Sequence, residues 1–232
     1  MNILYEIEKE LSQKCNKYVE CLAEIKDFPC KDDETFKSFL CVRFDDLKEV
    51  VKHKFESTPK SADAFMIFQN YLLLVEFKNP WKKSFLEVLR NFPRIRNGRI
   101  KKIIKESLEK EFELREIVVD SLQILNVLSG REKEMIATVT RFYFVFSFRK
   151  DFLESIELII PQLRLRKLSP DSKSEFFRKI RNTVIEIANK ELEKVSKELK
   201  LQESKGLSCE DFRDFIILSK RHFIYPATVK KE

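Results

Sequence analysis

Hydrophobic positions along the first part of the chain follow helical spacing. Residues 1–26 carry apolar side chains at intervals of three to four, which predicts a first helix or a pair of helices. After the break FPCKDDETF, Asp33 is the expected N-cap of a second helix, and the apolar residues from Phe36 to Phe55 keep to one side of it. This helix is expected to end before Pro59 and to lie on a flat surface.

The pattern changes to that of strands over residues 63–78. The segments DAFMIF and YLLLVEFK are rich in aromatic and branched side chains, and Gln69-Asn70 lies between them, which predicts a β-hairpin entering the centre of a sheet. Because side chains alternate along a strand, Glu76 and Lys78 are expected to point to the same side of that sheet.

Helical patterns return after the hairpin. Asn79-Pro80 predicts a helix start before WKKSFLEVLRNF, and a further helix is expected at about residues 99–113. Residues 115–128 fit a helix or a strand. The segment TRFYFVFSF at 140–148 has the strongest isolated strand signal, and a long amphipathic helix is predicted over 173–204.

This order of elements predicts an α/β protein with a small mixed central sheet flanked by helices and with a helical C-terminal extension. Residues 1–165 are expected to form the α/β core with its N-terminal helices. Residues 166–232 are expected to form the extension, either as a separate unit or packed as part of one domain. The helix over 173–204 offers a surface for a homodimer, although packing on the core is the simpler interpretation.

Composition restricts the class of protein. With 232 residues, 43% hydrophobic residues and 21 Phe, the chain can bury a sizeable core. Its apolar runs are far shorter than the roughly 20 residues that cross a bilayer, and Glu and Lys are frequent in residues 1–30, so we expect a soluble, cytoplasmic protein without a membrane partner. The 3 Gly give little scope for a glycine-rich phosphate-binding loop.

The cysteines do not follow a metal-binding pattern. They are Cys15, Cys21, Cys30, Cys41 and Cys209, an odd number without a CxxC pair. Their spacing does not fit a compact set of ligands for zinc or for an iron–sulfur cluster. We therefore expect reduced, mostly buried thiols.

Positive charge is concentrated in one part of the chain. The net charge is +7, and the segment from Lys82 to Lys105 is densely basic, with Glu87 as its one acid. Clustered cations favour binding of a polyanion such as nucleic acid, although a solvated helix face explains the same pattern. The residues expected to contact nucleic acid are Lys82, Lys83, Arg90, Arg94, Arg96, Arg99, Lys101 and Lys102.

Asp63, Glu76 and Lys78 form the candidate site. The acid opens the first strand of the predicted hairpin and the Glu-x-Lys closes the second, so all three belong to one end of the sheet. Two carboxylates suit a hard divalent cation, and a neighbouring Lys can orient a water or stabilise charge on a phosphodiester. A structural interpretation remains open, in which Asp63 caps a turn and Glu76 pairs with Lys78 at a solvated strand end.

This arrangement resembles the PD-(D/E)xK nuclease superfamily, whose restriction-endonuclease-like core contains a helix, a hairpin that carries an Asp and then a Glu-x-Lys, and a further helix and strand. The resemblance covers about residues 34–148 and lies in the motif and the order of elements. Three residues separate Pro59 from Asp63, so the adjacent Pro-Asp pair of the family motif is absent. The tripeptide alone is not specific, since it also begins at Glu24, Asp46, Asp171, Glu198 and Glu203.

The resemblance implies a metal-dependent nuclease. We favour DNA over RNA as the substrate, although nothing in the sequence itself separates the two. It implies Mg²⁺ or Mn²⁺ bound by Asp63 and Glu76, with Lys78 beside the attacking water. Many members use one more carboxylate from the preceding helix, and helical phase favours Asp46. In a branch similar to viral cap-snatching endonucleases the Lys comes from the next helix, where Lys82 or Lys83 would serve.

Two other classes of function stay open. One is a catalytically inactive nucleic-acid-binding or scaffold module of the same fold. The other is a protein-interaction domain that self-associates through its long C-terminal helix.

Overall fold

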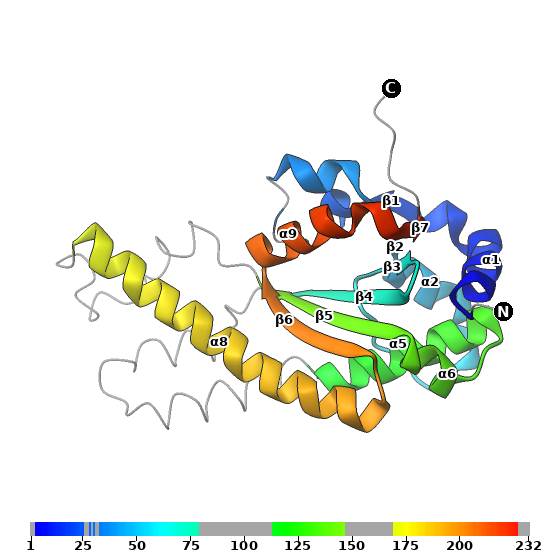
Figure 1. Ribbon diagram of the computed structural model, residues 1–232. Helices are drawn as coiled ribbons and strands as arrows, with labels where there is room; N and C mark the ends of the chain where they lie inside the picture. Colours follow the sequence, from blue (N-terminus) through cyan, green and yellow to red (C-terminus); the bar gives the residue numbers. More distant parts are fainter. Residues whose placement is uncertain are drawn as a thin grey trace.

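A mixed sheet of seven strands forms the centre of the part of the chain that the structure describes. The structure is a computed structural model and describes residues 3–25, 28, 30, 33–78, 113–146 and 169–226 (Figure 1). The strands are β1 (Val19–Cys21), β2 (Leu40–Arg43), β3 (Ala64–Phe68), β4 (Tyr71–Lys78), β5 (Thr140–Phe146), β6 (Glu203–Ser208) and β7 (Phe223–Tyr225). The α-helices are α1 (Ile3–Cys15), α2 (Phe44–Val51), α5 (Leu114–Ser129), α6 (Lys133–Thr138), α8 (Pro170–Leu199) and α9 (Cys209–Ser219).

The sheet combines an antiparallel half with a parallel half. Its order is β1-β2-β3-β4-β5-β6, and β7 also pairs with β3. Strands β1 to β4 are antiparallel neighbours, whereas β4, β5 and β6 run parallel. The carboxyl ends of the parallel strands therefore meet at one edge, where Lys78 is in register with Phe146 and Phe146 with Ser208. The expected α/β class with a mixed sheet flanked by helices is confirmed.

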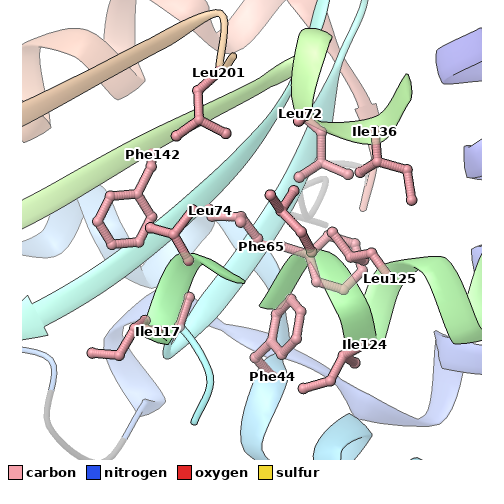
Figure 2. Packing of buried hydrophobic residues seen from close by; sticks show 14 of the residues in the cluster. Phe44, Phe65, Leu72, Leu74, Ile117, Ile124, Leu125, Ile136, Phe142 and Leu201 are labelled. Carbon is pink, nitrogen blue, oxygen red and sulfur yellow. The ribbon is translucent and has the colours of Figure 1, made fainter. Parts of the chain in front are cut away.

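Helices cover the two faces of the sheet unequally. One face packs against α1, α2, α5, α6 and the second half of α8, and the other packs against α9 and the short 3-10 turns η2 (Leu22–Glu24) and η3 (Glu34–Ser38). In Figure 1, α9 lies on the opposite side of the strands from α5. Figure 2 shows the first face, with Phe65, Leu74 and Phe142 from the strands packed with Ile117, Ile124 and Leu125 from α5.

The predicted hairpin and its alternation are confirmed. Strands β3 and β4 pair in register from Ala64↔Val75 to Phe68↔Tyr71 across the Gln69-Asn70 turn. Leu72 and Leu74 are buried on the face of α5, and Leu73, Val75 and Phe77 are buried on the face of α9. Both faces are covered, which explains why this hairpin is almost continuously apolar.

The ambiguous segment 115–128 is helical. Helix α5 ends at Gly130, which has φ +71° and whose N–H donates to the carbonyl of Asn126. A glycine in the left-handed region closes a helix without strain from a Cβ atom. The buried residues of α5 cover the sheet face on which Glu76 lies.

The prediction of one long second helix was wrong. Asp33 does cap a helix, since its carboxylate accepts from the N–H of Thr35, but that helix is only the turn η3. Residues Leu40–Arg43 form β2, and α2 begins at Phe44. The apolar spacing continues through all three elements, so periodicity alone did not reveal a short strand held by pairing with β1 and β3. For the N-terminal segment, the alternative of a single first helix is the one observed, since α1 is followed by a 3-10 turn (Asn16–Tyr18) and β1.

The C-terminal segment is less helical than predicted. Helix α8 ends at Leu199 instead of 204, because Lys200 adopts φ +56° and breaks the helical path. Beyond it, β6 pairs with β5 and β7 pairs with β3, so this segment contributes two strands to the sheet. The second half of α8 packs on the core through Val184, Ile187, Ala188 and Leu192. The helices predicted near residues 81–92 and 99–113 lie outside the described residues.

One disulfide contradicts the expectation of reduced thiols. Cys30 and Cys209 are joined, with an S–S distance of 2.09 Å and a sequence separation of 179 residues, whereas Cys15, Cys21 and Cys41 are free thiols. The bond ties the segment before η3 to the first residue of α9, on the sheet face opposite α5. No helix in the described ranges is long and apolar enough to cross a membrane.

Candidate active site at the end of the hairpin

Asp63 is fixed at the point where the hairpin opens. Its N–H donates to the carbonyl of Val75 at 3.0 Å, and its own carbonyl accepts from the N–H of Phe44 at 3.0 Å. Its carboxylate Oδ2 accepts from the N–H of Phe77 at 2.6 Å. The side chain thus continues the hydrogen bonding of β3 with β4 beyond Ala64, the first residue of β3. This bond places the Asp63 carboxylate beside residues 76 and 77.

Glu76 is a buried acid in the middle of an apolar sheet. Its side chain lies on the same face as Leu72 and Leu74, it is in register with Phe144 of β5, and the residue is only 1% exposed. Its Oε1 is paired with Lys78 Nζ, whereas its Oε2 is buried and has no hydrogen-bond partner within the described part of the chain. A buried oxygen without a partner is destabilising by roughly 1–3 kcal/mol, more if it is charged.

The surroundings of Glu76 disfavour its charged form. Burial, the largest cause, and the negative charges of Asp63 and Asp45 together raise the pKa of Glu76 to about 8 against the opposing effect of Lys78. A carboxyl group with this pKa keeps its proton at neutral pH until a further positive charge arrives. A bound divalent cation would supply that charge and would lower the pKa.

The structure therefore brings the three predicted residues together. Parts of the structural interpretation are also observed, because Asp63 accepts a backbone hydrogen bond and Glu76 pairs with Lys78. Its other part, a solvated strand end, is observed for Lys78, whose side chain is 27% exposed, but not for Glu76, which is buried. An ion pair that serves only to keep a strand end soluble would not require a buried carboxyl group, because burying a charged group is costly.

The upstream acids Asp45 and Asp46 have different environments. Asp46, the residue favoured by helical phase, accepts from Arg43 Nε at 2.8 Å, and Arg43 also pairs with Glu20 at 3.3 Å. Asp45 pairs with Lys48 at 2.7 Å, accepts from Ser61 Oγ at 3.3 Å, and contributes to the raised pKa of Glu76. The preference for Asp46 was based on the helical phase of one long helix over Phe36 to Phe55, whereas α2 begins only at Phe44. Both acids belong to the first turn of α2.

Helix α5 contributes two residues that the sequence did not reveal. Asp120 and Ser121 accept hydrogen bonds from backbone N–H groups of the segment that leads to Asp63. Their position on α5 could not be deduced while residues 115–128 fitted a helix or a strand.

The described residues offer two acids for a metal at this site rather than a complete set of ligands. They contain no group of three or more His, Cys, Asp or Glu side chains arranged to hold a metal ion. The unpartnered Oε2 of Glu76 nevertheless fits a Mg²⁺ or Mn²⁺ site, because such ions are held by one or two carboxylates with water and substrate phosphate oxygens in the remaining positions. The basic residues expected to contact nucleic acid, Lys82 to Lys102, lie outside the described residues.

No protein-family model, curated protein or solved structure matches this chain.

Proposed function

We propose that this protein is a metal-dependent nuclease that hydrolyses phosphodiester bonds, with DNA as the preferred substrate. Asp63 and Glu76 would bind Mg²⁺ or Mn²⁺, and Lys78 would lie beside the attacking water. The observation that carries this proposal is the buried Glu76 carboxyl group, which has an unpartnered oxygen and lies next to a second acid and a Lys.

Each of the three side chains has a distinct role in this proposal. The hydrogen bond from Phe77 N–H holds the Asp63 carboxylate in one orientation, which reduces the ordering needed when a ligand binds. Glu76 provides the unpartnered Oε2 as a ligand atom once it has lost its proton. Lys78, whose Nζ lies against Glu76 Oε1, can donate to a water or to a phosphate oxygen on the same side of the strand.

The metal would supply the part of the chemistry that these side chains cannot. When bound, Mg²⁺ or Mn²⁺ polarises the phosphodiester and lowers the pKa of the attacking water. The low exposure of Glu76 supports this use, because electrostatic interactions are stronger where water is excluded. The position at the carboxyl ends of parallel strands also supports it, since ligands commonly bind at this edge of α/β sheets.

We favour Asp45 as the upstream carboxylate that acts as an outer partner of the metal, because its charge raises the pKa of Glu76. Both upstream acids are engaged by a basic side chain, Asp45 by Lys48 and Asp46 by Arg43. The Asp45 side chain is 61% exposed, so a water between Asp45 and the metal would not require the side chain to be buried.

The experiment that tests the proposed function combines metal binding with cleavage. Mn²⁺ would be titrated by calorimetry into wild type and Glu76→Gln, and both proteins would be incubated with single- and double-stranded DNA and RNA. Glu20→Gln is a matched control, because Glu20 also pairs with a basic side chain, that of Arg43, and has an unpartnered buried Oε1, three strands away in the sheet.

We expect wild type and Glu20→Gln to bind Mn²⁺ and to cleave, and Glu76→Gln to do neither while remaining folded. If wild type binds nucleic acid in a salt-sensitive manner without metal or cleavage, the inactive binding module replaces the nuclease. A stable oligomer without either activity would favour the protein-interaction domain. Homodimer formation through α8 and cytoplasmic location stay predictions.

A further inference from the structure

The segment from Lys60 to Asp63 is attached to α5 by side chains of that helix. The N–H of Lys60 donates to Asp120 Oδ2 at 2.8 Å, and the N–H of Ala62 donates to Ser121 Oγ at 2.9 Å. The second bond is buried, and Ser121 is 0% exposed. These bonds hold two alternate amides of a segment without regular secondary structure, immediately before the acid of the candidate site.

A second contact reinforces this attachment from the surface. Lys60 Nζ pairs with Glu113 at 2.7 Å and also with Glu116, one turn earlier on α5 than Asp120. Exposed ion pairs of this kind contribute little to stability. Here they add a contact of the Lys60 side chain to the hydrogen bond that the Lys60 N–H makes with Asp120.

The hydroxyl of Ser121 is used differently from that of another buried serine in the same helix. Ser129 Oγ donates to the carbonyl of Leu125, four residues earlier, and accepts from the N–H of Arg131, two residues later, so both bonds are local. Ser121 instead accepts from a residue 59 positions away in sequence. The two serines therefore allow a comparison between a contact to the site segment and a contact inside α5.

The geometry assigns Asp120 and Ser121 as positioning residues, which hold the Lys60–Asp63 segment so that the Asp63 carboxylate faces Glu76 in the metal site. This inference rests on the proposed function for the part that concerns the metal. Asp63 itself bonds to Val75, Phe44 and Phe77, on β4 and at the start of α2. In the preceding segment, Ser61 Oγ donates to Asp45 of α2, whereas the N–H groups of Lys60 and Ala62 are held by α5.

The test uses the full chain with Mn²⁺ as the probe. Ser121→Ala and Asp120→Ala remove the two acceptors, Asp120→Asn keeps an acceptor oxygen without the charge, and Ser129→Ala is the control in the same helix. We expect Ser121→Ala and Asp120→Ala to weaken Mn²⁺ binding by about tenfold, the smaller effect seen for outer partners of metal ligands. Asp120→Asn and Ser129→Ala should bind within about twofold of wild type, well inside that range.

A second measurement reports on Asp63 directly. Because Phe77 N–H donates to Asp63 Oδ2, displacement of that carboxylate should shift the Phe77 amide resonance and speed its hydrogen exchange in Ser121→Ala and Asp120→Ala, but not in Ser129→Ala. If Ser121→Ala does not fold, Asp120→Ala, at a less buried position, gives the same comparison.

The outcomes separate the positioning role from the nuclease proposal. If wild type binds Mn²⁺ and both alanine variants bind it equally well with an unchanged Phe77 amide, the positioning role is overturned and the nuclease proposal stands. If wild type binds no Mn²⁺, the metal part of both proposals fails, and the Phe77 amide then shows whether α5 fixes Asp63. A loss of affinity in Ser129→Ala equal to that in Ser121→Ala would reduce the effect to general destabilisation and would also overturn the role.

Discussion

Asp63 Oδ2 accepts a hydrogen bond from the N–H of Phe77 at 2.6 Å, so a side chain immediately before β3 binds the backbone of β4 between Glu76 and Lys78. This relationship makes the positions of all three candidate residues depend on one another. Loss of any one of them is therefore expected to change both the local structure and the proposed chemistry, and each variant requires its own control.

The stability of the protein without metal should fall as pH rises because of Glu76. The pKa of Glu76 is raised from an ordinary value of 4.5 to about 8, so between these pH values the folded state holds a proton that the unfolded state has released. Stability is then lost with increasing pH, at up to about 1.4 kcal/mol per pH unit. Glu76→Gln should lack this contribution.

Urea unfolding of wild type and Glu76→Gln at several pH values between 5 and 8 measures this effect, with EDTA present to remove metal ions. The difference in unfolding free energy should shift in favour of Glu76→Gln as the pH rises. A difference that stays constant across this range would show that Glu76 is ionised in the folded protein.

Metal binding should show the opposite dependence on pH. A Glu76 carboxyl group that binds Mn²⁺ must first lose its proton, so the affinity should rise by up to about tenfold per pH unit below pH 8 and then level off. Calorimetry at pH 7 in two buffers of different ionisation enthalpy should detect close to one released proton per Mn²⁺. An affinity independent of pH, without proton release, would contradict binding through Glu76.

Asp45 and Asp46 should respond differently to neutralisation. Asp45→Asn should lower the pKa of Glu76, because the charge of Asp45 raises it, and should weaken Mn²⁺ binding a few-fold. Asp46→Asn should leave both nearly unchanged and should instead weaken the contact with Arg43. A ¹³C NMR titration of the Glu76 carboxyl group and calorimetry measure the two effects, and a larger response to Asp46→Asn would restore the assignment favoured by helical phase.

Reduction of the Cys30–Cys209 disulfide should destabilise the protein. The bond closes a loop with a sequence separation of 179 residues, and disulfides of this kind typically contribute about 2–4 kcal/mol by restricting the unfolded chain. Thermal unfolding with and without a reductant measures the loss. Cys30→Ser should show a similar loss and no further response to the reductant. Identical unfolding of oxidised and reduced wild type would mean that the bond adds no stability.

Local patterns in the sequence were sufficient for the hairpin and for the three residues at its end. The strands β3 and β4 are long, apolar and separated by a two-residue turn, and Glu76 and Lys78 share a face through simple alternation. Asp63 follows from the same pattern, because it stands next to the first strand. In each case the relevant contacts join residues of one hairpin.

Contacts between distant segments could not be predicted in this way. Strand β2 has four residues within an apolar pattern that also fits a helix, and β6, with the sequence ESKGLS, is a strand only because β5 pairs with it. The Cys30–Cys209 bond and the attachment of Ala62 to Ser121 likewise join segments far apart in sequence. These features depend on the tertiary fold, which a single sequence does not reveal through periodicity.

The pairing of β7 with β3 also affects when the hairpin can fold during synthesis. Strand β3 meets β2 through Phe65 and Ala64 and meets β7 through Ile67 and Phe68, so the two strands share one side of β3. Tyr225 of β7 further donates to Asn16 at 3.0 Å, next to the end of α1. During synthesis on the ribosome, half of one edge of β3 therefore stays unpaired until β7 has emerged. The hairpin that carries the candidate site reaches its final pairing only after nearly all of this sequence has been translated.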